Sequence, residues 1–267
     1  MKYSIITINL NNREGLKKTI ESVVNQTCQD FEYIIIDGGS TDGSVDIIKE
    51  YSSRIDYWVS EPDKGIYNAM NKGIAKAHGE YLNFMNSGDY FCNNKVLSDV
   101  LSAHTNADFF VGRVYNVNSD GIIISSSIVT EELSMKWFYI NTIPHQSTFI
   151  RRELFIKSMY DENLKIVADW KFFMEKIVFE GCSVFKDDSF FVACCEERGA
   201  SMDRQQLDAE KTKILRETLP IGIRKDYDVI APIGREFLNL SAKLNMNRAL
   251  SLIFLNIFRL LKLLKII

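Results

Sequence analysis

Residues 3–90 alternate between short apolar segments and longer segments in which apolar side chains recur every three or four residues. The longer segments have the periodicity of helices with one buried face, whereas short uninterrupted apolar runs are typical of buried strands. The apolar runs cover residues 3–10, 31–36, 55–59 and 81–85. Strands that alternate with helices form a parallel sheet with helices on its faces. The sequence therefore predicts an α/β fold with a Rossmann-like, mostly parallel sheet flanked by helices.

Each of these predicted strands is followed by polar residues. Asn9 lies at the end of the first strand and Asp37 directly follows the second. Asp63 follows the third strand, and Asp89 follows the fourth. A buried apolar strand needs no acid at its end for its own stability. Because ligands of open α/β sheets bind beyond the carboxyl ends of the strands, these side chains predict a polar ligand site at that edge.

Charge and cysteine usage argue against two other functions. A net charge of -3 is not that of a globally basic protein, so we expect no nucleic-acid partner. The five cysteines include no CxxC pair, which leaves a zinc site unsupported. An odd cysteine count and an N-terminus without the features of a signal peptide predict reduced thiols and a cytoplasmic protein.

The alternation stops after residue 106. Further strands are predicted over 107–117, 121–128, 145–150 and 184–195, with a helix over 170–179 and a charged, mostly helical region over 203–236.

The C-terminal segment 248–267 has one wholly apolar face and a basic opposite face. A core or dimer helix and a membrane-spanning helix are both compatible with its length, although Asn256 and Arg259 near its middle oppose spanning. A helix lying in the membrane interface, with its basic face toward anionic headgroups, fits the pattern best. We therefore expect peripheral contact with the inner face of the cell membrane.

Five segments together resemble glycosyltransferase family 2, the inverting enzymes of the GT-A fold, and in particular bacterial members that build surface polysaccharides. The most specific are 60–73 (SEPDKGIYNAMNKG) and 37–42 (DGGSTD), and the others are 4–9 (SIITIN), 144–149 (PHQSTF) and 168–170 (ADW).

The resemblance implies a domain organisation. Residues 1–202 would form a GT-A catalytic domain, with a nucleotide-sugar-binding half over 1–100 and an acceptor-side half over 101–202. Residues 203–267 would form a C-terminal helical region that ends in the amphipathic tail. The implied reaction moves a sugar from a nucleotide-diphosphate donor, a UDP-sugar by family frequency, to a glycan or lipid-linked glycan.

The resemblance also implies roles for single residues. Asp37 would accept the ring N–H of uracil, and its alternative reading is a turn or helix-cap residue. The other residues implied to line the nucleotide-sugar site are Thr7, Asn9, Asp63, Lys64, Ser87 and His145. For Lys64 the alternative is a solvated lysine at a helix start, and for His145 it is a structural histidine in an apolar strand.

The metal motif of the family is reduced here. Its position reads Asn86-Ser87-Gly88-Asp89, which leaves Asp89 as the candidate ligand for a divalent cation, Mn²⁺ or Mg²⁺. One carboxylate can suffice, because Mg²⁺ often takes most of its oxygens from phosphate and water.

Asp169 lies at the position of the family's general base, and its alternative reading is a helix N-cap. Trp170 beside it would either stack on a sugar ring or pack its helix. Two other functions are open: a non-catalytic nucleotide-sugar or glycan binder, and another nucleotide-dependent transferase. The second would need a phosphate-cradling glycine-rich loop, and residues 11–15 are not such a loop.

Overall fold

The computed structural model describes residues 2–103, 106–118, 120–127, 132–196, 203–228 and 256. The chain forms two compact units, which are described separately. The first comprises Met1–Phe138 and Thr142–Ile214, and the second comprises Tyr139–Asn141 and Leu215–Ile267. The domain division predicted after residue 202 stays a prediction.

The first unit is built on a nine-stranded mixed sheet with the order β3-β2-β1-β4-β8-β6-β9-β5, to which β7 is added through β6. Its parallel part consists of β1 (Tyr3–Asn9), β2 (Phe31–Asp37), β3 (Tyr57–Ser60) and β4 (Tyr81–Phe84). The register pairs Asn9 with Asp37 and Asp37 with Ser60, so the carboxyl ends of three strands meet. The predicted α/β fold with a mostly parallel first half is confirmed.

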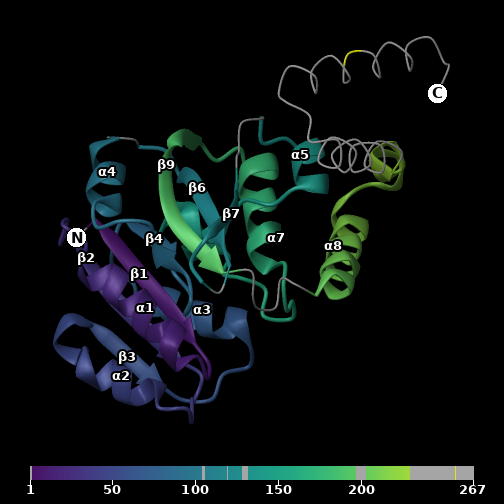
Figure 1. Ribbon diagram of the computed structural model, residues 1–267. Coiled ribbons are helices and arrows are strands. Elements are labelled where there is room, and N and C mark those ends of the chain that lie inside the picture. The colour runs from purple at the N-terminus through teal and green to yellow at the C-terminus, as the bar shows by residue number, and fades with distance from the viewer. Residues whose placement is uncertain are drawn as a thin grey trace. The chain divides into compact units, whose positions relative to one another are not determined.

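The remaining strands extend the sheet beyond β4. They are β8 (Thr148–Arg151), β6 (Phe109–Val117), β9 (Val184–Glu196), β5 (Tyr90–Phe91) and β7 (Ile123–Ser126). β8 runs antiparallel to both β4 and β6, and β9 runs parallel to β6. Figure 1 shows β9 in green beside β6, and β1 in purple at the other side of the sheet. The segment predicted as a strand over 145–150 begins instead with a 3-10 turn over His145–Ser147.

Helices follow the first three strands, as the periodicity predicts, and further helices lie later in the chain. The helices are α1 (Arg13–Val24), α2 (Ser44–Glu50), α3 (Ile66–Lys76), α4 (Val96–Ser102), α5 (Met135–Ile140), α6 (Leu154–Lys157), α7 (Ala168–Met174) and α8 (Arg204–Thr218). Of these, α4, α5 and α6 were not predicted. The helix predicted over 170–179 is α7 continued by a π-turn over Glu175–Phe179.

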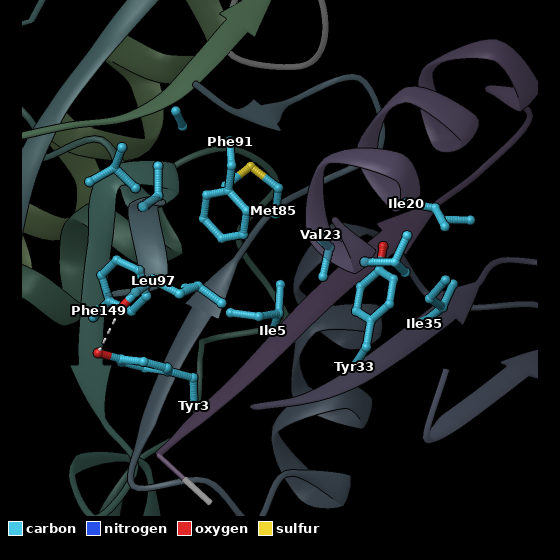
Figure 2. Packing of buried hydrophobic residues seen from close by; sticks show 14 of the residues in the cluster. Tyr3, Ile5, Ile20, Val23, Tyr33, Ile35, Met85, Phe91, Leu97 and Phe149 are labelled. Atoms are coloured by element: carbon cyan, nitrogen blue, oxygen red, sulfur yellow. Dashed lines mark hydrogen bonds between the residues drawn. The ribbon is translucent and has the colours of Figure 1, made fainter. Parts of the chain in front are cut away.

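Alternate side chains of β1 face opposite layers of the first unit. Tyr3 and Ile5 pack toward Val23 of α1, and the Tyr3 ring lies 5.3 Å from that of Phe149, centroid to centroid (Figure 2). Ile6 faces α3, where a Cβ on Gly73 would lie 2.5 Å from the Ile6 side chain. A glycine therefore lets α3 approach the sheet closely. Burial of each such isoleucine contributes about 1.5–3 kcal/mol, which holds the strand ends in fixed register.

The predicted amphipathic tail, residues 248–267, lies outside the described residues except for Asn256. In the described part of the chain, no helix is both long enough and apolar enough to cross a membrane.

Candidate active site

Asp37 links the ends of the first three strands. Its side chain is fully buried, and Oδ1 accepts hydrogen bonds from Asn9 Nδ2 (2.7 Å) and Ser40 Oγ (2.6 Å). Oδ2 accepts from Ser60 Oγ (2.6 Å) and from the backbone N–H groups of Ser40 (2.9 Å) and Gly39 (3.2 Å). Burial alone would raise the pKa of Asp37, but these donors hold it below its usual range. Contact of Asp37 with the base stays a prediction.

Thr7 lies beneath this edge of the sheet. It is fully buried, and its hydroxyl donates to the Met85 carbonyl oxygen (2.8 Å) and lies 3.0 Å from Tyr33 Oη. The backbone N–H of Ser87 donates to the Ile8 carbonyl (3.0 Å). These bonds place the segment 86–89 against the end of β1. The residues that follow β2 and those that follow β4 therefore lie at the same edge of the sheet.

Asp63 and Lys64 precede α3. Asp63 Oδ1 accepts from the backbone N–H of Gly65 (2.8 Å), whose φ of 120° suits glycine. The backbone N–H of Lys64 donates to Asn68 Oδ1 (3.1 Å), and the Lys64 side chain is exposed. Asp63 is therefore held at the turn into the helix, and Lys64 stays accessible to a ligand phosphate.

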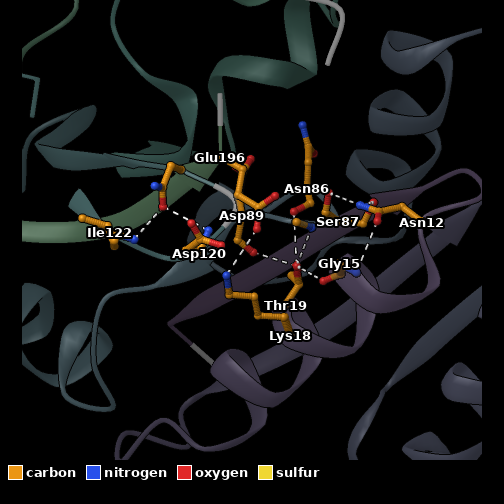
Figure 3. Close-up of polar contacts among 12 residues, drawn as sticks. Asn12, Gly15, Lys18, Thr19, Asn86, Ser87, Asp89, Asp120, Ile122 and Glu196 are labelled. Atoms are coloured by element: carbon orange, nitrogen blue, oxygen red, sulfur yellow. Dashed lines mark hydrogen bonds and ion pairs between the residues drawn. The ribbon is translucent and has the colours of Figure 1, made fainter. Parts of the chain in front are cut away.

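The segment 86–89 is fastened to α1, as Figure 3 shows. Thr19 Oγ1 donates to the Asp89 carbonyl (2.6 Å) and accepts from Gly88 N–H (3.0 Å). Asn12 Nδ2 donates to the Ser87 carbonyl (2.9 Å). The backbone that carries Asp89 is therefore fixed by side chains from a helix 70 residues earlier in the chain.

The Asp89 carboxylate lacks a full countercharge. Oδ2 accepts from Gln146 Nε2 (3.0 Å), and the Cys195 thiol is a second donor. Burial raises the pKa of Asp89 to about 6, against the opposing effect of His145 and these donors. Within the described ranges, no lysine or arginine forms an ion pair with this carboxylate.

A divalent cation at Asp89 stays a prediction: the carboxylate accepts from Gln146 and has no lysine or arginine partner among the described residues, so it could supply one oxygen ligand. The described residues offer no cluster of three His, Cys, Asp or Glu side chains that could hold a metal. The remaining ligands would therefore be phosphate and water oxygens, as Mg²⁺ often prefers.

His145 and Asp169 form a hydrogen-bonded pair beside this segment. His145 Nδ1 lies 2.9 Å from Asp169 Oδ2, and both side chains are largely buried. His145 Nε2 lies 3.2 Å from Asn86 Nδ2. Burial favours the neutral imidazole, but the hydrogen bond and charge of Asp169 raise the pKa of His145 above its ordinary value. His145 lies in the 3-10 turn before β8 and not in an apolar strand, and its contact with the donor stays a prediction.

Tyr67 fixes the other oxygen of Asp169. Its hydroxyl lies 2.9 Å from Asp169 Oδ1 and 2.6 Å from the Ile166 carbonyl oxygen, and Trp170 N–H also donates to Oδ1 (2.8 Å). Burial alone would raise the pKa of Asp169, but the bonds from His145, Trp170 and Tyr67 hold it below its usual range. Trp170 itself is buried and donates to the Phe138 carbonyl (2.9 Å), so it packs its helix and does not face a sugar.

Sequence reasoning missed four partners of the site: Tyr67, Asn86, Gln146 and Cys195. Tyr67 and Gln146 each lie inside a segment that carries the family resemblance, and Asn86 lies in the reduced metal motif. Cys195 had no signal of its own. A separate cavity of about 140 Å³ lies at the opposite end of the strands, lined by residues such as Lys2, Tyr81 and Phe110, and it holds none of the predicted site residues.

The sequence model of the family described as "Glycosyl transferase family 2" matches residues 4–158, more than half of the chain. An uncharacterized glycosyltransferase of Mycobacterium tuberculosis is 34% identical over 176 residues, which cover 64% of this chain and 67% of that protein. A glycosyltransferase of PGL/p-HBAD biosynthesis from Mycobacterium bovis is 31% identical over 177 residues, with the same coverage of 64% and 67%.

Solved structures share the fold at low sequence identity. Staphylococcus aureus TarS 1–349 in complex with UDP-GlcNAc matches with a TM-score of 0.64 and 18% identity over 85% of this chain and 70% of that chain. A mannosyltransferase from Pyrobaculum calidifontis in complex with GDP-Man and Mn²⁺ matches with a TM-score of 0.60 and 15% identity, over 97% and 80%. The match to another crystal structure of TarS 1–349 has a TM-score of 0.61 and covers 73% of this chain and 60% of that chain.

The fold and the family match define a glycosyltransferase of the GT-A fold. The chain belongs to glycosyltransferase family 2.

Proposed function

We propose that this glycosyltransferase moves a hexosyl or N-acetylhexosaminyl group, with inversion, from a UDP-sugar to a glycan or lipid-linked glycan acceptor. One observation carries the proposal. Asp89, a carboxylate without a lysine or arginine partner among the described residues, lies beside the His145–Asp169 pair at the edge where the parallel strands end. Asp37 and Asp63 lie at the same edge on the β2 side.

The donor side of the proposal is supported by the position of Asn9 at the end of β1 and of Asp63 in the turn after β3, with Asp37 holding these strand ends together. TarS, which shares the fold, has been solved with UDP-GlcNAc. The diphosphate would follow the base toward β4, where Ser87 and Asp89 lie against the end of β1. Asp89 would hold Mn²⁺ or Mg²⁺ there, and such a cation would offset the charge that develops on the diphosphate leaving group.

Asp169 is proposed as the general base that takes the proton from the acceptor hydroxyl. An ionised carboxylate offers about four hydrogen-bond acceptor positions, and His145, Tyr67 and Trp170 occupy three of them. One position is left for the acceptor hydroxyl. The lowered pKa keeps Asp169 ionised at neutral pH, which is the state that a base requires.

The acceptor is proposed to lie at a membrane surface. The M. bovis relative is described as a biosynthetic glycosyltransferase of PGL/p-HBAD. We propose that the tail 248–267 binds the inner face of the cell membrane through its apolar and basic faces, which brings the enzyme to a lipid-linked acceptor.

The experiment is a thermal-shift screen of nucleotide sugars with and without Mn²⁺, followed by donor hydrolysis with any sugar nucleotide that raises the melting temperature. We expect a UDP-sugar to raise it in the presence of Mn²⁺ and to be hydrolysed slowly. A chain that binds the donor but never releases UDP, even with candidate acceptors, would be a binding protein, and the proposed transfer would be wrong.

A further inference from the structure

The hydrogen-bond capacity of Asp37 is fully used inside the protein. Its two oxygens accept from five donors: two serine hydroxyls, the Asn9 amide and two backbone N–H groups. A carboxylate offers about four acceptor positions, so none is left for a ligand. The side chain is also completely buried. Asp37 therefore has a structural role: its hydrogen bonds hold the ends of β1, β2 and β3 together.

The next residue, Gly38, leaves a space that another carboxylate fills. A Cβ added to Gly38 would lie 2.5 Å from Asp63 Oδ2 and 3.3 Å from Leu10 Cδ1. Gly38 is not among the residues with positive φ, so its backbone does not require glycine. What requires glycine here is space: the missing side chain lets the Asp63 carboxylate lie over the end of β2.

Asp63 and Leu10 both present atoms beside Gly38 that a ligand could contact. Asp63 Oδ1 accepts from Gly65 N–H, but in the part of the chain that the structure describes Oδ2 has no hydrogen-bond donor. Leu10 directly follows the fully buried strand β1 and is 57% exposed, so its side chain is open to a ligand. A free acceptor and an exposed apolar side chain on either side of a glycine suit a flat ring that carries an N–H.

We propose that Asp63, and not Asp37, accepts the ring N–H of the donor's uracil, with the ring lying beside the Asp63 carboxylate and against the exposed face of Leu10. This rests on the proposed function, because it assigns the base subsite of the same donor. Uracil carries a hydrogen on N3 and donates it to the carboxylate, whereas cytosine has a lone pair at N3 that a carboxylate repels. Asp63 would therefore select uridine over cytidine nucleotides.

The test is calorimetric titration of the full chain with UDP and with CDP, both with Mn²⁺, for the wild type and for Asp63→Asn, Gly38→Ala and Asp37→Asn. Asp46→Asn is the matched control, because Asp46 is exposed on α2 and its nearest cation is 3.9 Å away. A charge-assisted hydrogen bond lost from the site predicts about 10- to 100-fold weaker UDP binding in Asp63→Asn. CDP affinity should stay level or rise, so the UDP-to-CDP ratio collapses.

The other variants separate the two carboxylates. Gly38→Ala displaces the Asp63 carboxylate and should lower the same ratio, whereas Asp46→Asn should leave it unchanged. Asp37→Asn should lower the melting temperature and keep the ratio of the wild type. An unchanged ratio in Asp63→Asn would overturn the inference whether or not Asp37→Asn folds. A wild type that binds UDP and CDP equally would also overturn it, and a wild type that binds no nucleoside diphosphate would instead defeat the proposed function.

Discussion

Asp89→Asn should make the metal-free protein more stable, although it removes the proposed metal ligand. The substitution keeps the size of the side chain and an oxygen that can accept from Gln146, but it removes the charge. Burial raises the pKa of Asp89 from 3.8 to about 6. The folded protein therefore binds this proton more tightly than the unfolded chain does, and ionising the carboxyl costs stability.

The sign and size follow from proton linkage. Between pH 3.8 and about 6 the folded state holds the extra proton, so stability falls as pH rises through this window and stays lower above it. A difference of about 2 pKa units corresponds to about 3 kcal/mol at most. Asp89 is only half-buried, and water screens part of the cost, so we expect about 1–2 kcal/mol.

The assay is thermal unfolding in EDTA, from pH 4 to pH 8, of the wild type, Asp89→Asn and the surface control Asp46→Asn. At pH 7.5 the Asp89 variant should melt about 3–6 °C above the wild type, and the gap should close toward pH 4. Mn²⁺ with UDP should then stabilise the wild type and leave the variant unchanged. A variant that melts below the wild type at pH 7.5 in EDTA would refute the reasoning, because the carboxylate would then be paired in the metal-free protein.

Three further predictions concern the base and the tail. Asp169→Asn should bind UDP-sugar like the wild type and transfer it about 10²-fold or more slowly, and near-normal transfer would move the base elsewhere. Tyr67→Phe removes one of the bonds that lower the pKa of Asp169, so the acidic limb of the transfer rate should shift to higher pH while donor binding is kept; an unshifted limb would show that the bond does not act on the base. Truncation before Arg248 should release the protein from membranes with donor hydrolysis intact, and binding of the full chain to anionic liposomes should weaken with salt. A sharp loss of melting temperature on truncation, without liposome binding by the full chain, would instead indicate a packed helix.

The parallel half of the fold could be predicted because its signals are local. The apolar runs of β1 and β2 and the helical spacing between them each lie within a few residues of one another. The order of the strands beyond β4 could not be predicted in the same way. β6 pairs with both β8 and β9, and such pairing depends on packing between segments that are far apart in sequence. The polar run His145–Ser147 also forms a turn before β8, and the large apolar side chains of this segment, Phe149 and Ile150, lie within the strand itself.

The residues of the site likewise fall into those that the sequence marks and those that it does not. The carboxylates Asp37, Asp89 and Asp169 stand out in sequence because they follow apolar strands or begin a helix. Their partners do not, since the Tyr67 hydroxyl meets Asp169 across 102 residues of chain. The full set of donors to Asp37 was likewise invisible, because Asn9 and Ser60 lie 28 and 23 residues away in sequence, and Ser40 alone of the side-chain donors is local.

The most direct test of the account is a crystal structure of the full chain grown with UDP and Mn²⁺, in which the anomalous signal locates the metal. The account predicts one Mn²⁺ within coordination distance of the Asp89 carboxylate, bridging to the diphosphate, with UDP lying along the ends of β1, β2 and β4. A nucleotide bound instead in the cavity beside Tyr81 and Phe110, or a metal bound to the diphosphate without Asp89, would contradict it.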